Sequence, residues 1–382
     1  MFEPSVITIS RSAFATNLAF IRQRLDGARL CSVVKGNAYG HGISTFVPMA
    51  MDAGVDYFAV YSADEAYALL NAVDGAPKVF IMGMTEGDAL DWAIEHGVEC
   101  CIHRTGQLDD ALRSAARIGE RCRIHVELET GMHRTGFAQS EMPHVIERLK
   151  NASGSYVLTG LFTHFAGAES SSNDDRVVDQ IAHFRAMRQQ FERNGLHPEY
   201  GHQACSAAMM NFPGTVDGMA RIGIMQYGFW SNQETWFRYS AVNKVQTDPL
   251  RRLISWSSRV MTMTQVPAGA PIGYGSSCIA PRELRVAVVP VGYAHGFDRG
   301  LSNSGRVLVR GQLAPVMGIV NMNAITVDIT DVEGVEHGDE VVMIGHQGDR
   351  WISVSSFSEL SDQLNYEMLT RLPRDIPRIL TD

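Results

Sequence analysis

Residues 32–42 decide the fold, and they read Ser32-Val33-Val34-Lys35-Gly36-Asn37-Ala38-Tyr39-Gly40-His41-Gly42. An apolar run from residue 30 to 34 ends abruptly in a lysine, and a glycine-rich loop follows. Because α/β folds build their sites where parallel strands end, this run predicts a strand that delivers the Lys35 amine to the rim of a barrel or sheet. For Val-Val-Lys alone, a lysine that merely ends a strand and reaches into water is the simpler interpretation. The eleven-residue context favours a site.

The same strand signal recurs along the first 230 residues. Eight segments have a β-like apolar pattern: 29–35, 56–61, 78–82, 98–103, 122–129, 156–164, 198–204 and 219–227. Amphipathic helical patterns flank them. In the first, over 11–25, Ser10 is the expected N-cap and the shared apolar face consists of Phe14, Leu18, Ile21 and Leu25. Eight such alternations over about 230 residues predict a (β/α)8 TIM barrel, which we place at residues 1–240.

After residue 240 the sequence changes in character. Short Val/Ile-rich runs separated by Gly/Pro turns occupy 254–264, 284–293, 305–310, 315–329 and 338–345, and a long helical pattern returns only at 357–370. This pattern predicts a mostly-β second domain over 241–382, which residues 1–10 are able to join. The predicted fold class is therefore α/β, an N-terminal barrel followed by a C-terminal mostly-β domain.

Composition excludes several classes of protein. The 382 residues carry a formal net charge of −9 without a run of basic residues, which argues against a nucleic-acid partner. We see no signal peptide and no apolar run of the ~18 residues that a membrane span needs, so no membrane partner is expected. The six cysteines lack C-x-x-C spacing and are interpreted as core residues of a cytoplasmic protein, with no metal site.

Seven segments in this order resemble the alanine racemase family, and the similarity runs from Lys35 to Tyr366. Val33 to Gly42 is similar to the family's cofactor-lysine loop, and Glu-Thr-Gly-Met-His-Arg-Thr-Gly at 129–136 to its D-T-G-M-x-R-x-G segment. The remaining similar segments are Gly-Leu-Phe-Thr-His-Phe at 160–165, Ser-Ala-Ala at 206–208, Arg-Ile-Gly-Ile at 221–224, Ile-Gly-Tyr-Gly at 272–275 and Asn-Tyr-Glu at 365–367.

The resemblance implies an isomerase that uses pyridoxal 5'-phosphate to interconvert L- and D-alanine. It implies two opposed bases, Lys35 and Tyr274, and a head-to-tail homodimer in which Tyr274 reaches the partner's site. The implied cofactor contacts are Lys35, Tyr39, His164, Ser206, Arg221, Gly223, Ile224 and Tyr366. The implied substrate contacts are Arg134, Tyr293, Met322 and Asn323. Because a free phenol has a pKa near ~10, we expect His164, linked to Arg221, to assist Tyr274.

Three residues depart from the family pattern. Glu127 stands where many members have a carbamylated lysine, so we expect it to form a charge-assisted pair with Arg134 directly. Asn323 and His295 each replace an aspartate near the substrate entrance. The loss of two acids leaves serine, lysine or a broader set of amino acids open as substrates beside alanine.

Two other functions remain as alternatives. A decarboxylase of the same architecture usually carries a catalytic cysteine beside an acid in its C-terminal domain, but Cys278 is followed by Ile279. A non-catalytic carrier of pyridoxal phosphate resembles the barrel alone, whereas this chain has a further ~140 residues that include Tyr274. Supply of a D-amino acid and its breakdown are equally compatible with the sequence.

Overall fold

The computed structural model describes residues 5–355, 357 and 365–382. The chain folds into two compact units, each of which draws on more than one stretch of the sequence. The barrel unit comprises 12–36 and 47–252, and the C-terminal unit comprises 1–11, 37–46 and 253–382. Within the described residues, no helix combines the length and the apolar character needed to cross a membrane.

The barrel unit contains a parallel sheet of eight strands in the order β8-β7-β6-β5-β4-β3-β2-β9. The strands are β2 (Arg29–Val33), β3 (Tyr57–Val60), β4 (Lys78–Ile81), β5 (Glu99–Ile102), β6 (Cys122–Glu127), β7 (Tyr156–Phe162), β8 (Tyr200–His202) and β9 (Met219–Ile222). The two ends of this strand order are β8 and β9. A bridge between Cys205, which follows β8, and Arg221 in β9 joins them. Each strand lies within one of the eight predicted segments, and the barrel prediction is confirmed.

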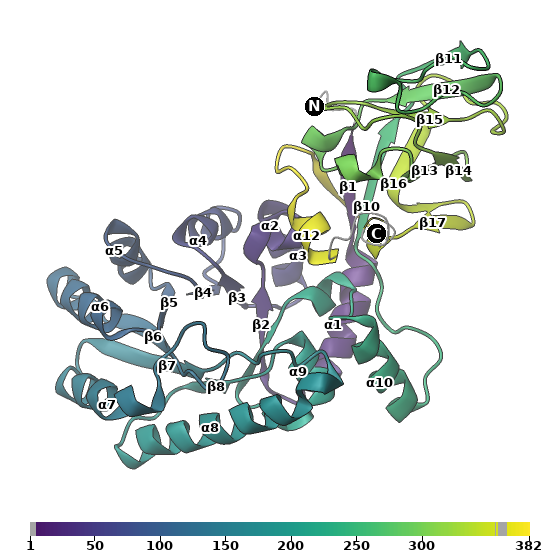
Figure 1. Cartoon of the computed structure of the whole chain (residues 1–382). Helices are drawn as coiled ribbons and strands as arrows, with labels where there is room; N and C mark the ends of the chain where they lie inside the picture. Colours follow the sequence, from purple (N-terminus) through teal and green to yellow (C-terminus); the bar gives the residue numbers. More distant parts are fainter. Residues whose placement is uncertain (1–4, 356, 358–364) are drawn as a thin grey trace. The chain divides into compact units, whose positions relative to one another are not determined.

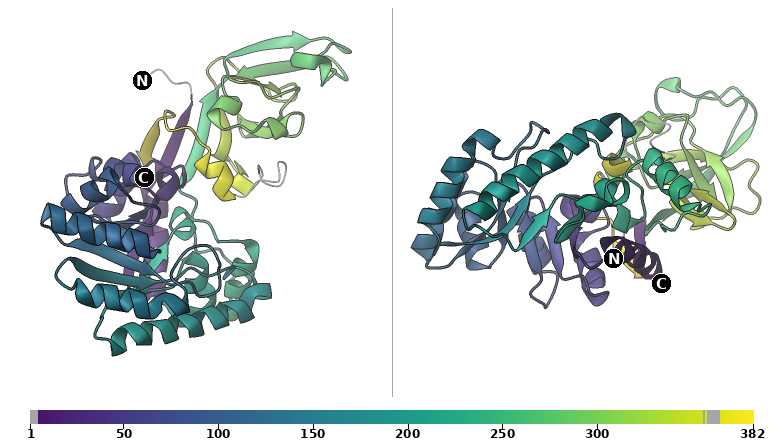
Figure 2. Two further views of the ribbon diagram at one scale, coloured as in Figure 1. Left: turned by 60° about the vertical axis from the view of Figure 1, so that its left-hand side comes forward. Right: turned by 90° about the horizontal axis from the view of Figure 1, so that it is seen from below.

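The helices α4 to α8 follow one another in chain order around the outside of these strands (Figures 1 and 2). The helices are α1 (Arg11–Leu25), α3 (Ile43–Asp52), α4 (Ala63–Leu70), α5 (Asp88–Glu95), α6 (Thr105–Ile118), α7 (Met142–Asn151), α8 (Asp174–Arg193), α9 (Ser206–Asn211) and α10 (Gln233–Asn243). The predicted apolar face of α1 is buried, with Phe14, Leu18, Ile21 and Leu25 each at most 3% exposed.

The C-terminal unit is built mainly of β-strands, as predicted. One sheet has the order β14-β13-β16-β10-β1-β18 with β17 paired to β16, and a second has the order β11-β12-β15. The strands are β1 (Val6–Ser10), β10 (Ile254–Arg259), β11 (Thr262–Val266), β12 (Leu284–Val289), β13 (Arg306–Val309), β14 (Gln312–Pro315), β15 (Ile325–Asp328), β16 (Glu340–Gln347), β17 (Arg350–Ile352) and β18 (Arg378–Thr381).

Two predicted segments differ in detail. Residues 254–264 form two strands, β10 and β11, which belong to different sheets. The predicted helix over 357–370 is represented by α12 (Asn365–Thr370), and residues 358–364 lie outside the described part of the chain.

Candidate active site

Lys35 follows β2 at the C-terminal edge of the barrel, where its side chain is exposed. The strand end that delivers it is fixed by side chains from the far end of the barrel sequence. The Val33 carbonyl accepts hydrogen bonds from Gln226 Nε2 and Tyr227 Oη, both at 3.0 Å. Desolvation by the surrounding protein lowers the pKa of Lys35, and the charges of Arg134 and Arg221 lower it further. The amine therefore deprotonates more readily than a free lysine.

The loop after Lys35 is a left-handed turn, which the sequence pattern did not predict. Gly36, Asn37, Ala38 and Tyr39 in α2 (Lys35–Tyr39) have φ values between 51° and 63°, and Gly40 has φ 79°. A left-handed conformation costs roughly 1–2 kcal/mol for each residue with a side chain. Such strain persists only where surrounding contacts over-determine it, and it is typical of functional sites.

Glu65 is a second feature that was not predicted from the sequence. Its side chain is 8% exposed and accepts hydrogen bonds from the backbone N–H of Gly36 at 2.7 Å and of Tyr61 at 2.9 Å. The signal was the sequence Ser62-x-x-Glu65, which is typical of a helix N-terminus. Ser62 does cap α4, but the glutamate side chain reaches the turn after Lys35 and holds it.

A chain of hydrogen bonds crosses the interior of the barrel from Arg221. Arg221 Nη1 donates to His202 Nδ1 at 2.6 Å, and His202 Nε2 lies 2.8 Å from His125 Nδ1. His125 Nε2 lies 2.6 Å from Glu99 Oε2, which also accepts from the Tyr57 hydroxyl. All five residues are at most 4% exposed and come from five different strands.

The direction of every bond in this chain follows from the arginine, which can only donate. His202 accepts at Nδ1, so its proton is on Nε2 and points to His125. His125 then accepts at Nδ1 and donates from Nε2 to the Glu99 carboxylate. Burial and the charge of Arg221 lower the pKa of His202, which keeps it neutral as this order requires. Although burial raises the pKa of Glu99, hydrogen bonds from His125 and Tyr57 lower it overall.

Arg221 is further held by carbonyl groups. Nη1 also donates to the His202 carbonyl at 2.7 Å, and Nη2 donates to the Thr163 carbonyl at 2.8 Å. Among the described residues, none accepts a hydrogen bond from Arg221 Nε. The guanidinium is thus fixed in position, and of its five N–H groups the Nε–H and one Nη2–H are left for a ligand.

Three of the implied cofactor contacts, Ser206, Gly223 and Ile224, lie together. Ser206 opens α9, is 5% exposed, and accepts a hydrogen bond from the Gly223 backbone N–H at 3.1 Å. Ile224 begins the short 3-10 helix η4 (Ile224–Tyr227) directly after Gly223. Since β9 pairs with β2 in a register that matches Ile222 to Ser32, Gly223 and Lys35 follow adjacent strands.

His164 follows β7, where the charge of Arg221 acts on it, and the predicted link between the two residues stays a prediction. The hydrogen bonds of Arg221 go to His202 and to backbone carbonyls, and within the described chain the His164 ring does not contact it through a hydrogen bond. Burial, together with the charges of Arg221, Arg134 and Lys35, lowers the pKa of His164 to about 3. His164 is therefore neutral at physiological pH and can act there only as a neutral hydrogen-bond partner.

Gln180 on α8 holds the backbone around His164. This side chain is 1% exposed; its Nε2 donates to the His164 carbonyl at 3.1 Å and its Oε1 accepts from the Ala166 N–H at 2.9 Å. Nε2 also lies 3.3 Å from Thr130 Oγ1, which is 2.7 Å from Thr163 Oγ1. One buried amide thus joins the ends of β6 and β7.

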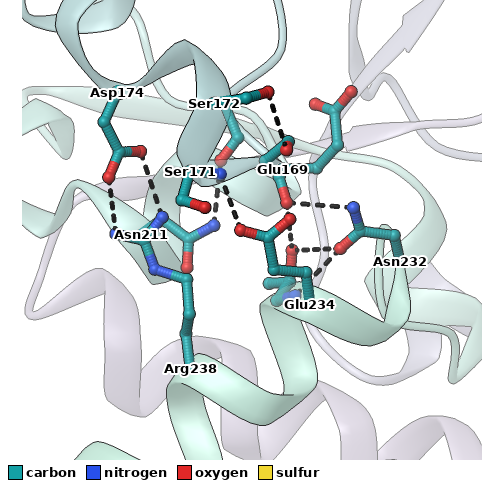
Figure 3. Close-up of polar contacts among 11 residues, drawn as sticks. Glu169, Ser171, Ser172, Asp174, Asn211, Asn232, Glu234 and Arg238 are labelled. Carbon is teal, nitrogen blue, oxygen red and sulfur yellow. Dashed lines mark hydrogen bonds and ion pairs between the residues drawn. The ribbon is translucent and has the colours of Figure 1, made fainter.

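The loop that continues from His164 is fastened to the start of α10 (Figure 3). Glu234 accepts a hydrogen bond from the Ser171 N–H at 2.6 Å, and Asn232 Nδ2 donates to the Glu169 carbonyl at 2.9 Å. Asp174 and Arg238 form a bidentate ion pair at 3.0 and 3.1 Å. These contacts connect the loop after β7 to the segment that follows η4.

The structure contradicts the expected pair between Arg134 and Glu127. The Arg134 side chain is exposed and forms no ion pair within the described residues, whereas Glu127 is 7% exposed and lies against Cys101. The reason is Glu129, whose carboxylate accepts the backbone N–H groups of Gly131, His133 and Arg134 and so shapes the loop. Arg134 still acts by charge, since it lowers the pKa of both Lys35 and His164.

The C-terminal unit supplies the remaining predicted residues on its loops. Tyr274 opens the 3-10 helix η5 (Tyr274–Ser276) and is 73% exposed, and Met322 is 55% exposed. The loop of Tyr293 meets the loop of Met322 and Asn323, because the Tyr293 N–H donates to the Asn321 carbonyl and the Ala294 N–H to the Met322 carbonyl, both at 3.0 Å.

Two further contacts in this unit bear on the predictions. The rings of Tyr39 and Tyr366 lie with their centroids 6.0 Å apart. His295, which replaces a typical aspartate, accepts the Gly292 N–H at Nδ1 over 3.1 Å. His295 thus caps the backbone of η6 (Tyr293–His295), a structural role that was not expected from the sequence.

Comparison with known proteins identifies the family. The family model described as alanine racemase, N-terminal domain, matches residues 9–230, and that of the C-terminal domain matches residues 253–380. Alanine racemase 1 of Caldanaerobacter subterraneus subsp. tengcongensis is 31% identical over 378 residues, which cover 98% of this chain and 94% of the relative.

Comparison with solved structures identifies the same family. Alanine racemase of Clostridium difficile 630 superposes with a TM-score of 0.91 at 26% identity, covering 100% of this chain and 96% of that one. The fold is also shared, with a TM-score of 0.84 at 23% identity, by the alanine racemase of Bartonella henselae with covalently bound pyridoxal phosphate; there 99% of each chain is covered. The chain is an amino-acid racemase, an isomerase. It belongs to the alanine racemase family.

Proposed function

We propose that this enzyme interconverts L- and D-alanine with pyridoxal 5'-phosphate as cofactor. The observation that carries the proposal is the register of β2 and β9, since it brings the strand that precedes Lys35 beside the strand that carries Arg221 and leads to Gly223. The names of the relatives support alanine as the substrate. The six cysteines are all free thiols, which supports a reducing, cytoplasmic setting.

The residues present fit the cofactor. Lys35 would hold it covalently, the Ser206 hydroxyl and the backbone N–H groups of Gly223 and Ile224 would hold its phosphate, and Tyr39 and Tyr366 would add hydroxyl groups. The unused Arg221 Nε–H suits an acceptor such as a pyridine nitrogen. When bound, pyridoxal phosphate withdraws the electron pair left on the substrate α-carbon after its proton is removed.

The chain's own groups then move the proton. Lys35 Nζ, with its lowered pKa, would exchange the α-proton on one face of the substrate. The Tyr274 hydroxyl would exchange it on the other face, with the neutral His164 as a hydrogen-bond partner. Because Arg221 cannot give up its proton and is held by His202, it would keep the pyridine nitrogen unprotonated. Arg134 would attract the substrate carboxylate.

Tyr274, Met322 and Asn323 are proposed to serve the site of a second copy in a head-to-tail homodimer. The high exposure of Tyr274 and Met322 in their own chain supports this arrangement. It is tested by mixing inactive Lys35→Ala and Tyr274→Phe proteins. Shared sites should restore part of the activity, because some mixed dimers then contain one intact pair of bases. Failure to complement, with dimers present, would place both bases in one chain.

The activity itself is tested by a chiral assay of the purified protein with added cofactor. We expect D-alanine from L-alanine, with less product from serine, lysine, arginine or glutamate. A protein that binds the cofactor and racemises none of them would be a carrier. Borohydride reduction followed by mass analysis should attach the cofactor to wild-type protein and not to Lys35→Ala.

A further inference from the structure

Three side chains with different metal-binding atoms meet near the ends of β5 and β6, and the charge of Arg221 acts on Cys101 and Glu127. The Cys101 Sγ atom lies 3.9 Å from Glu127 Oε2 and 3.9 Å from His103 Nδ1. The three ligand atoms all lie within 4.8 Å of one another. Cys101 and Glu127 are buried, and His103 is partly exposed. No sequence spacing signals this cluster, because Cys101 and His103 lie at the end of β5 whereas Glu127 ends β6.

We propose that Cys101, His103 and Glu127 bind a divalent transition metal ion of the zinc type. A thiolate, an imidazole and a carboxylate are the three kinds of side chain that bind Zn²⁺ in proteins. A thiolate and a carboxylate together supply two negative charges, which balance a divalent ion. That balance matters here, because an unpaired charge is costly in a buried place.

The two separations from the Cys101 sulfur are close to what such an ion needs, and the third, between His103 and Glu127, is at most 4.8 Å. Bond lengths of ~2.3 Å to sulfur and ~2.1 Å to nitrogen or oxygen place tetrahedral ligands roughly 3.5 Å apart. The two sulfur separations of 3.9 Å therefore need to shorten by only a few tenths of an ångström. The partly exposed His103 provides the side from which an ion can enter, and three protein ligands leave one coordination position for water.

The surroundings support a role for Glu127 that differs from pairing with an arginine. Its carboxylate lies against the thiol, and the pKa of the buried Cys101 thiol is raised by burial and by this carboxylate. A protonated thiol that only donates a weak hydrogen bond to Glu127 is the competing explanation. The two differ in whether a metal ion displaces the thiol proton.

The first experiment is equilibrium dialysis of the purified full-length protein against Zn²⁺, followed by metal analysis. We expect one bound Zn²⁺ per chain, and at least tenfold weaker binding in Cys101→Ser and in His103→Ala. Matched controls are Cys278→Ser and His144→Ala, which alter a cysteine and a histidine outside the cluster and should bind as the wild type does. His103 is partly exposed, so its replacement tests the site even if Cys101→Ser does not fold.

The second experiment replaces Zn²⁺ with Co²⁺. Coordination by the Cys101 thiolate should produce a sulfur-to-cobalt charge-transfer band that Cys101→Ser lacks and Cys278→Ser keeps. The proposal is overturned if the wild-type protein binds no more Zn²⁺ than the two cluster variants, or if cobalt gives no such band. Neither readout depends on racemase activity, so the outcome is independent of the proposed reaction.

Discussion

The buried hydrogen-bond chain of the barrel unit and the exposed loops of the C-terminal unit present functional residues in opposite ways. In the barrel, Arg221 and His202 are 4% and 0% exposed, and side-chain hydrogen bonds fix each of them. In the C-terminal unit, Tyr274 and Met322 are 73% and 55% exposed, and backbone contacts shape the loops near them. The barrel residues are therefore positioned by their own unit before any ligand binds.

This difference in burial predicts different effects of substitutions on stability and on activity. Residues that complete a buried hydrogen-bond chain contribute to folding as well as to the site, since an unsatisfied buried group costs roughly 1–3 kcal/mol. Exposed loop residues contribute little to folding, and substitutions there usually change stability by less than about 0.5 kcal/mol. We therefore expect substitutions in the two units to differ in their effect on the free energy of unfolding.

The largest effect is expected from Gly160→Ala, which places a methyl group inside the buried chain. Gly160 is a buried residue of β7, and an added Cβ would overlap His125 Nδ1 and His202 Nε2, the two atoms that bond to each other. Overpacking combined with loss of these hydrogen bonds should lower the free energy of unfolding by about 3–5 kcal/mol. Denaturant unfolding measures the loss.

Gly154→Ala is the matched control for this substitution. Gly154 lies in the turn before β7, and nothing lies within 4 Å of an added Cβ there. We expect a change of at most about 0.5 kcal/mol. Equal losses in the two variants would show that the space beside the histidine pair is not what makes Gly160 necessary.

The next largest effect is expected at a buried histidine of the C-terminal unit. His41 is 0% exposed, and its Nδ1 lies 3.0 Å from the carbonyl oxygens of Ala38 and Tyr39, which it can hold as a donor. Burial, with the charge of Arg378, lowers the pKa of His41 to about 4. In the unfolded chain its pKa is ~6.5, so the unfolded state binds more protons between these two values.

Stability from His41 is therefore complete above pH ~6.5 and falls as the pH drops toward 4, by about 3 kcal/mol in all. Since other histidines titrate as well, the contribution is read from the difference between the wild type and His41→Asn, whose amide can still donate to the turn. The midpoint of thermal unfolding should fall more steeply with acid in the wild type. Parallel pH profiles would contradict the lowered pKa.

The sequence predicted the barrel well because each strand carries its own apolar run and each helix its own periodic face. The eight strands fall inside the expected segments, and Ser206 and Gly223 lie together as expected. The contacts between side chains on different strands of the barrel have no local signal in the sequence. His202, His125 and Glu99 are far apart in the chain, and only the closed sheet brings them together.

Two expected contacts of arginine residues show where the sequence pattern was insufficient. The expected pair of Arg134 with Glu127 failed because Glu129 binds the backbone of the loop and the arginine side chain remains exposed. Arg221 donates to His202, a partner that the sequence did not indicate, and its expected link to His164 stays a prediction. In both cases the residue types were compatible with the predicted contact, and only the three-dimensional arrangement shows which groups meet. The left-handed turn after Lys35 was missed because Asn37, Ala38 and Tyr39 are not glycines.

The smallest effect on stability, and a large effect on activity, is expected from Tyr274→Phe. The hydroxyl belongs to a side chain that is 73% exposed, so its removal should change the free energy of unfolding by less than about 0.5 kcal/mol. As a proton-transfer group it should contribute about 10²–10⁴-fold to the turnover number. Racemisation kinetics and thermal unfolding of the same preparations measure both. A variant that lost stability and activity in parallel would show that Tyr274 supports its own unit, and the contrast between the barrel and the C-terminal loops would then fail at the residue where it is sharpest.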